Sequence, residues 1–274
     1  LAAVEDLGFD YDSNLPFYWQ PHRSLNDLSP MEEDGLERGL RFYSPVTYPQ
    51  QSSLPRMIGR IVEIPVSLPD DEILLDRMGL SPARIAEVWT EMLQMALERG
   101  ELLTIQLHPE RLEILAEALK HVLEVASTEG VWIASMAEIS SWWRKRTEVE
   151  VEVVRADDGS FQLVNCSIPD LTFHLYDPAS AKLVAIESGK PFESRAIPLI
   201  GLDARVEPDL IHNLRQLGYP FEITEDRTKF NLFIEHGSKP EDFADLLRHA
   251  RGPLLRAATW PRSYRAAMCV TGDI

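Results

Sequence analysis

Strands and amphipathic helices alternate along the first half of the chain. The apolar runs that predict strands are 58–66, 102–107 and 131–135. Apolar residues recur at helical spacing after Pro82, after Glu110 and from Ala137. Ser81 and Gly100 supply the start and stop signals of the first of these helices. This alternation indicates an α/β fold with a parallel sheet or barrel.

Other regions follow different patterns. Residues 16–55 are rich in Pro, Ser, Asp and aromatic residues without a sustained period, which favours a functional loop or lid. From Thr147, valines alternate with glutamates, and short strands up to 195–200 follow without a long helix, which predicts a small antiparallel sheet. A helix, two strands and a second helix are then expected in 206–259, and a last strand at 266–270.

Composition excludes several classes of function. The formal net charge of −17 argues against nucleic acid, because binding it requires many Lys and Arg side chains. The same charge disfavours adhesion to anionic membranes, and no window of ~18 apolar residues predicts a membrane span. Cys166 and Cys269 lie far apart and are interpreted as two free thiols.

His108 is the first candidate for chemistry. It ends the apolar strand 102–107 and precedes Pro109 and a helix, and this strand end is a favourable place for catalysis in a β/α fold. A histidine also suits proton transfer, because its unperturbed pKa lies near neutrality. The alternative is a structural histidine that caps the next helix, with Pro109 at the first helical position.

Asp70 and Asp71 follow the predicted strand 58–66. They lie either at the rim of a catalytic sheet or in an exposed Pro-Asp-Asp-Glu turn that satisfies its own backbone hydrogen bonds. Glu63 sits inside the apolar strand, where we expect a structural ion pair with Arg60 or with a neighbour across the barrel.

Several motifs, in the expected order, resemble one known family. GRIVEIPVSLPDDE, LTIQLHPE and VWIASMAEISSWWRKR look like the later half of a polysaccharide deacetylase domain of the NodB-homology type, and the opening LGFDYDSN is similar too. The closing WPRSYRAAMCVTGDI resembles the first strand of such a domain, which ends in a Thr-x-Asp motif. The resemblance to the later half covers about the first half of the chain.

The resemblance implies a metal-dependent carbohydrate N-deacetylase, a hydrolase that cleaves the amide C–N bond of an N-acetylated sugar. His108 would be its general acid, Asp71 would hold the site in place, and Trp132 would line the wall of the acetyl pocket. Asp273 would be the general base of a second domain, or alternatively a plain strand-end carboxylate. Ile274 departs from the family's Thr-x-Asp-Asp pattern, so no metal-binding aspartate is assigned after it.

The family uses a divalent metal of the Zn or Co type, held by an Asp and two His. The His-x-x-x-His motif that supplies two of these ligands is absent from residues 1–274. The resemblance therefore places the ligands before Leu1, and we expect the chain, taken as a fragment of a longer protein, to bind no catalytic metal tightly and to be inactive alone.

The predicted fold class is α/β: a partial (β/α) deacetylase-type barrel, then a small antiparallel β module and an α/β segment. The expected boundaries are 1–146 for the later part of the barrel, 147–205 for the accessory β module, 206–259 for the α/β segment and 260–274 for the first strand of a second deacetylase-like domain. The expected partner is an N-acetylated glycan.

Two other functions remain open. A deacetylase-like fold without metal ligands could bind glycans or act as a scaffold without catalysis. A glycoside hydrolase would need two carboxylates across a groove, whereas Asp70, Asp71 and Glu63 come from one strand–turn unit.

Overall fold

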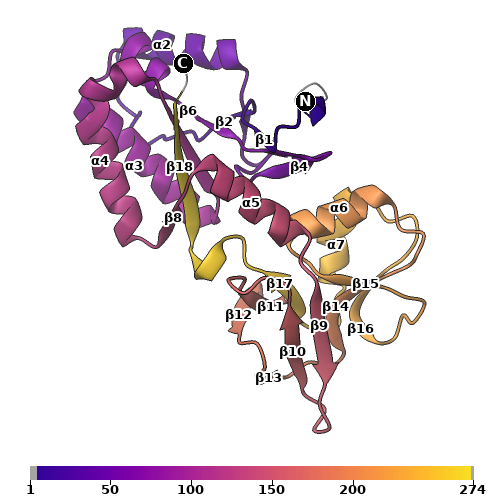
Figure 1. The fold of residues 1–274 in the computed structure, drawn as a ribbon. Coiled ribbons are helices and arrows are strands. Elements are labelled where there is room, and N and C mark those ends of the chain that lie inside the picture. The colour runs from indigo at the N-terminus through magenta and orange to yellow at the C-terminus, as the bar shows by residue number, and fades with distance from the viewer. Residues whose placement is uncertain (1–4, 273–274) are drawn as a thin grey trace. The chain divides into compact units, whose positions relative to one another are not determined.

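The computed structural model describes residues 5–272, and the chain forms two compact units (Figure 1). The first unit takes the chain up to Trp143 and again from Tyr264, and the second takes Arg144–Ser263. Asp273, the predicted base, lies outside the described residues. In residues 5–272 no helix is long and apolar enough to cross a membrane.

The first unit combines short strands with α-helices. Its strands are β1 (Tyr11–Asp12), β2 (Pro16–Tyr18), β3 (Val46–Thr47), β4 (Arg56–Ile58), β5 (Ile61–Glu63), β6 (Val66–Leu68), β7 (Leu102–Leu107), β8 (Val131–Ile133) and β18 (Ala266–Gly272). Its helices are α2 (Pro30–Tyr43), α3 (Pro82–Arg99), α4 (Leu112–Thr128) and α5 (Met136–Thr147), which carries the chain into the second unit. A π-helical turn, η1 (Glu72–Arg77), and a 3₁₀ turn, η2 (Pro109–Arg111), complete the list.

α3 and β7 lie where the sequence predicts them. The side chain of Ser81 accepts the N–H of Arg84 at the start of α3, and Gly100 ends the helix with a φ of 71°. The buried faces of α3, α4 and β7 share one apolar core. Local signals for caps and apolar runs suffice here, because tertiary packing agrees with them.

β18 joins the sheet of the first unit. It runs parallel between β7 and β8, with Ala267 level with Leu102 and Gly272 level with Leu107 (Figure 1). Ala266 and Cys269 in this strand are fully buried. The sequence interpretation separates 260–274 from the first half of the chain, whereas the structure joins β18 to the strand that precedes His108.

Two predicted elements are wrong. The expected strand 58–66 is a β4–β5 hairpin that turns at Gly59, with a φ of 60°, followed by β6. The expected loop 16–55 contains α2, which begins at a capping box formed by Ser29 and Glu32. The buried residues of this helix are Gly35 and Gly39, and Leu36 and Tyr43 pack against the core beside them.

The sheets of the first unit have three strands each, in the orders β1-β5-β4, β3-β2-β6 and β7-β18-β8. Within residues 5–272 they do not close into a barrel. The architecture is therefore mixed α/β with several small sheets.

The second unit contains three more small sheets. Its strands are β9 (Val151–Arg155), β10 (Phe161–Cys166), β11 (Phe173–Asp177), β12 (Lys182–Ile186), β13 (Pro191–Phe192), β14 (Ile197–Leu202), β15 (Phe221–Ile223), β16 (Phe230–Ile234) and β17 (Leu254–Ala257). Its helices and turns are α6 (Pro208–Leu217), η3 (Pro240–Asp242), α7 (Phe243–Arg248) and η4 (Pro261–Ser263).

β14 corrects the expected antiparallel module. β13-β10-β9 and β12-β11-β17 are antiparallel, but β14 is the central strand of a parallel sheet with β15 and β16. Its residues from Pro198 to Leu202 are buried without interruption, as is typical of a strand covered on both faces.

Candidate functional site

His108 follows β7 at the point where the chain enters η2. β7 is buried from Leu102 to Ile105, and Ser67 Oγ accepts the N–H of Thr104 at 3.0 Å, which fixes the strand to β6. His108 occupies the capping position of η2, but its side chain makes no capping hydrogen bond. The position of His108 before Pro109 thus agrees with the capping alternative, although the side chain does not make the capping hydrogen bond.

Asp71 contacts His108 twice. Its Oδ1 lies 2.7 Å from the imidazole Nδ1, and its Oδ2 accepts the backbone N–H of His108 at 2.7 Å. Asp71 is fully buried, whereas the His108 side chain keeps 18% of its surface exposed. The interpretation of Pro-Asp-Asp-Glu as an exposed turn is thus wrong. Because Nδ1 faces Asp71, Nε2 is the nitrogen available to a ligand.

The charge state of His108 depends on this contact. Burial of the imidazole lowers the pKa of His108, but the hydrogen bond and the negative charge of Asp71 outweigh burial, and the net pKa is raised. Arg111 opposes this increase, and Asp70 adds to it. A raised pKa suits a general acid, which must carry its proton at the working pH.

Arg111 lies beside the pair. Its Nη1 is 3.6 Å from Asp71 Oδ2, and its Nε donates to Asp76 Oδ2 at 3.1 Å. The guanidinium therefore offsets part of the negative charge buried at Asp71. Sequence reasoning missed Arg111. The available signal was its spacing, since residues three apart in a 3₁₀ turn project to the same side.

α2 supports the turn that follows Asp71. A Cβ at Gly35 would lie 2.2 Å from the backbone oxygen of Arg77, so glycine permits α2 to approach η1 this closely. Tyr43, at the end of α2, donates its hydroxyl to Glu72 Oε2 at 2.7 Å. Burial and this hydrogen bond both raise the pKa of Tyr43, which keeps it a neutral donor. Sequence reasoning predicted no supporting role for Gly35 or for Tyr43.

Asp70 precedes Asp71 and is 2% exposed. Its Oδ1 accepts the N–H of Ile73 at 2.9 Å, which fixes the first residues of η1. Its Oδ2 is buried and has no hydrogen-bond partner in the described part of the chain.

Of the predicted site residues, the structure brings together His108 and Asp71. It does not bring Trp132 to them: through Ala267 of β18, Trp132 is level with Leu102, roughly 16 Å along the sheet from Leu107. The Trp132 ring makes an edge contact with Trp142, with ring centroids 6.2 Å apart. Asp273 lies outside the described residues.

Metal binding finds no support in this site. Among residues 5–272, no group of three or more His, Cys, Asp or Glu side chains is placed to hold a metal ion. The residues present therefore do not fit the family's metal, and the ligands expected before Leu1 stay a prediction.

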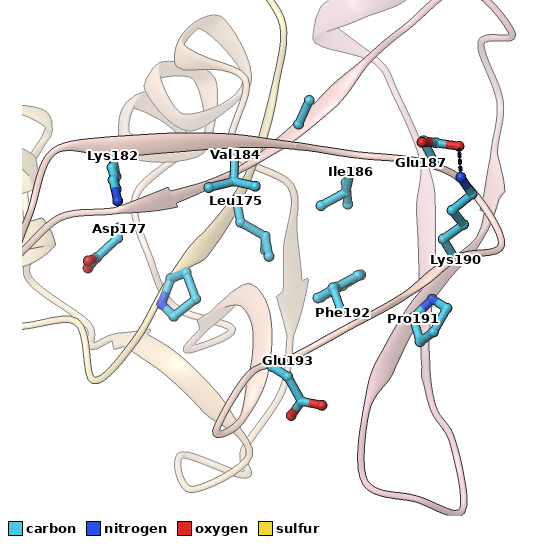
Figure 2. Close-up of a pocket in the computed structure, with 12 residues that line it drawn as sticks. Leu175, Asp177, Lys182, Val184, Ile186, Glu187, Lys190, Pro191, Phe192 and Glu193 are labelled. Carbon is cyan, nitrogen blue, oxygen red and sulfur yellow. Dashed lines mark ion pairs between the residues drawn. The ribbon is translucent and has the colours of Figure 1, made fainter.

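The second unit offers a different surface, a hollow of about 540 Å³ (Figure 2). Leu175, Val184 and Ile186 of β11 and β12 line it together with Phe192, and an ion pair of 2.6 Å joins Lys190 to Glu187 at its edge. The described residues that line this hollow include no histidine or cysteine.

No protein-family model, no curated protein and no solved structure matches the chain. The resemblance to deacetylases therefore rests on the sequence motifs alone.

Proposed function

We propose that the chain is part of a metal-dependent carbohydrate N-deacetylase, with His108 as general acid and Asp71 as the residue that orients it. The 2.7 Å contact between Asp71 Oδ1 and His108 Nδ1 carries this proposal. The two residues come from separate motifs, SLPDDE and LTIQLHPE, that resemble the same family. Chance placement of motifs would not require their two candidate residues to meet. In this proposal the first unit corresponds to the later part of a (β/α) deacetylase barrel.

The chemistry follows from the orientation of the ring. Hydrolysis of the acetamido group adds water to the carbonyl carbon and breaks the C–N bond, giving acetate and a free amine. His108 Nε2 donates its proton to the departing amine nitrogen, while Nδ1 keeps its hydrogen bond to Asp71. Asp71 thereby fixes the tautomer that His108 holds after transfer. The described residues supply neither the general base nor the metal, and we assign no step to that base or to that metal.

The test is His108→Ala in the complete protein that contains this chain, assayed by acetate release from an N-acetylated chitooligosaccharide. Loss of a general acid lowers kcat by about 10²-fold or more. His121→Ala is the matched control, because His121 is exposed on α4. Unchanged turnover in His108→Ala would remove His108 from the mechanism. A complete protein that binds the oligosaccharide without releasing acetate would favour the non-catalytic alternative.

A further inference from the structure

A capping role alone does not explain the presence of an acid at position 70. The turn needs one acceptor for the N–H of Ile73, and Asp70 Oδ1 supplies it. Asparagine presents the same acceptor without placing a charge in the interior. The second oxygen of Asp70 is buried without a partner among the described residues, which costs stability. The carboxylate therefore provides something other than hydrogen bonds.

What an aspartate provides and an asparagine does not is negative charge. Asp70 immediately precedes Asp71, which binds His108 through both oxygens. The charge of Asp70 acts on the imidazole in the same direction as that of Asp71, favouring the protonated ring. Because Asp70 is buried, solvent screens this interaction less than it would screen one at the surface.

We propose that Asp70 is a positioning residue of the His108 site, one that acts through its negative charge to keep the imidazole protonated. The inference rests on the proposed role of His108 as general acid. In this inference, the Asp70 oxygen without a hydrogen-bond partner carries negative charge near His108, the proposed general acid.

The groups around Asp70 set the pH at which this charge exists. The pKa of Asp70 is raised to about 6, mainly by burial. The N–H of Ile73 opposes this rise, and the charges of Asp71 and Glu72 contribute to it. Protonated His108 lowers the pKa of Asp70, and the charge of Asp70 contributes to the raised pKa of Tyr43. As pH rises through about 6, Asp70 becomes charged and supports the proton on His108. The two groups therefore titrate as a coupled pair.

The direct test is an NMR titration of the His108 imidazole in the chain itself, assigned by the signal lost in His108→Gln. In the native chain we expect the curve to show a second inflection near pH 6, where Asp70 ionises. In Asp70→Asn the inflection is lost and the midpoint of His108 moves to lower pH. An unchanged curve in Asp70→Asn overturns the inference.

Glu63→Gln is the matched control. Glu63 is a buried carboxylate whose pKa burial raises, but it accepts the N–H groups of Asn14 and Leu15 and does not act on His108. Its substitution should leave the His108 titration in place, and a shift equal to that of Asp70→Asn would contradict a specific role for Asp70. The titration needs no activity, so it fails or succeeds independently of the His108→Ala assay.

Unfolding by urea gives a second readout. The folded state binds the Asp70 proton more tightly than the unfolded chain, so the native protein loses stability as pH rises from about 4 to about 6. Asp70→Asn removes this loss, and its urea midpoint should exceed that of the native chain at pH 7 but not at pH 4. A lower midpoint at both pH values would show a purely structural hydrogen bond and overturn the inference.

Discussion

Buried carboxylates of the first unit occur in two settings that differ in how many donors surround them. Glu91 accepts the N–H groups of Arg23 and Ser24 at 3.0 and 2.7 Å and the Ser24 hydroxyl at 2.6 Å. Asp70 accepts one N–H and leaves Oδ2 unbound. Burial raises the pKa of both, but for Glu91 the donors outweigh burial and the net pKa is lowered. The several hydrogen bonds donated to Glu91 outweigh its burial, whereas the single N–H donated to Asp70 does not.

The difference separates anchoring from chemistry. Glu91 fixes the loop at Arg23 and Ser24, and Glu101 accepts the N–H of Ser53 at 3.0 Å. Glu63 also accepts two loop N–H groups. Arg60 pairs with Glu5 and not with Glu63, whereas Arg56 lies opposite Glu63 in the hairpin and its charge lowers the pKa of Glu63. Asp71, by contrast, contacts the imidazole of His108, and Asp70 immediately precedes it.

The largest effect is expected from Asp71→Ala. The substitution leaves the backbone N–H of His108 and the guanidinium of Arg111 without their buried anion. We expect a loss of roughly 3–5 kcal/mol in the free energy of unfolding, measured with urea at pH 7. Asp76→Ala is the control, since Asp76 pairs with the same arginine but is 49% exposed, and it should cost below about 1 kcal/mol. Equal losses would show that Asp71 contributes no more to stability than the exposed Asp76 does.

A smaller effect is expected from Gly35→Ala, which acts on the support of the site. The new Cβ would lie 2.2 Å from the backbone oxygen of Arg77, so α2 or η1 must move. Overpacking of this kind costs roughly 1–3 kcal/mol, and hydrogen exchange should speed up in 72–77. Asp34 is an exposed position one residue earlier, and Asp34→Ala should change neither the free energy of unfolding nor the hydrogen exchange of 72–77. Unchanged hydrogen exchange in Gly35→Ala would show that the contact of Gly35 does not support the turn after Asp71.

Local signals allowed α3 and β7 to be predicted from sequence, whereas those of α2 were not recognised. Ser81 and Gly100 mark their helix directly, and 102–107 is apolar throughout. α2 carried its own signals in the Ser29–Glu32 capping box and in Leu36, Leu40 and Tyr43 at helical spacing, but its fully buried positions are glycines. The turn at Gly59 was missed because Ile58 before it and Ile61 and Val62 shortly after it are apolar and favour one long strand.

The candidate site was partly predictable. Motif order singled out His108 and Asp71, although they lie 37 residues apart and their contact is a product of the fold. The pairing of β18 with β7 and β8 is equally non-local, and it places Trp132 level with Leu102 rather than with His108. The unbound oxygen of Asp70 could not be foreseen, because sequence does not tell how many donors a buried acid meets.

Glu91→Gln provides the smallest and most discriminating change. Glutamine keeps one oxygen for the N–H groups of Arg23 and Ser24 but loses the charge, and we expect a loss of about 1 kcal/mol at pH 7. Because the folded-state pKa of Glu91 is lowered, its ionised form adds stability that disappears as pH falls through that pKa. The urea midpoints of native and variant chains should therefore differ at pH 7 and converge near pH 3. Asp70→Asn should instead raise the urea midpoint at pH 7. If both substitutions lower the midpoint at pH 7, the two carboxylates have the same anchoring role, and the division between loop anchors and charge carriers is incorrect.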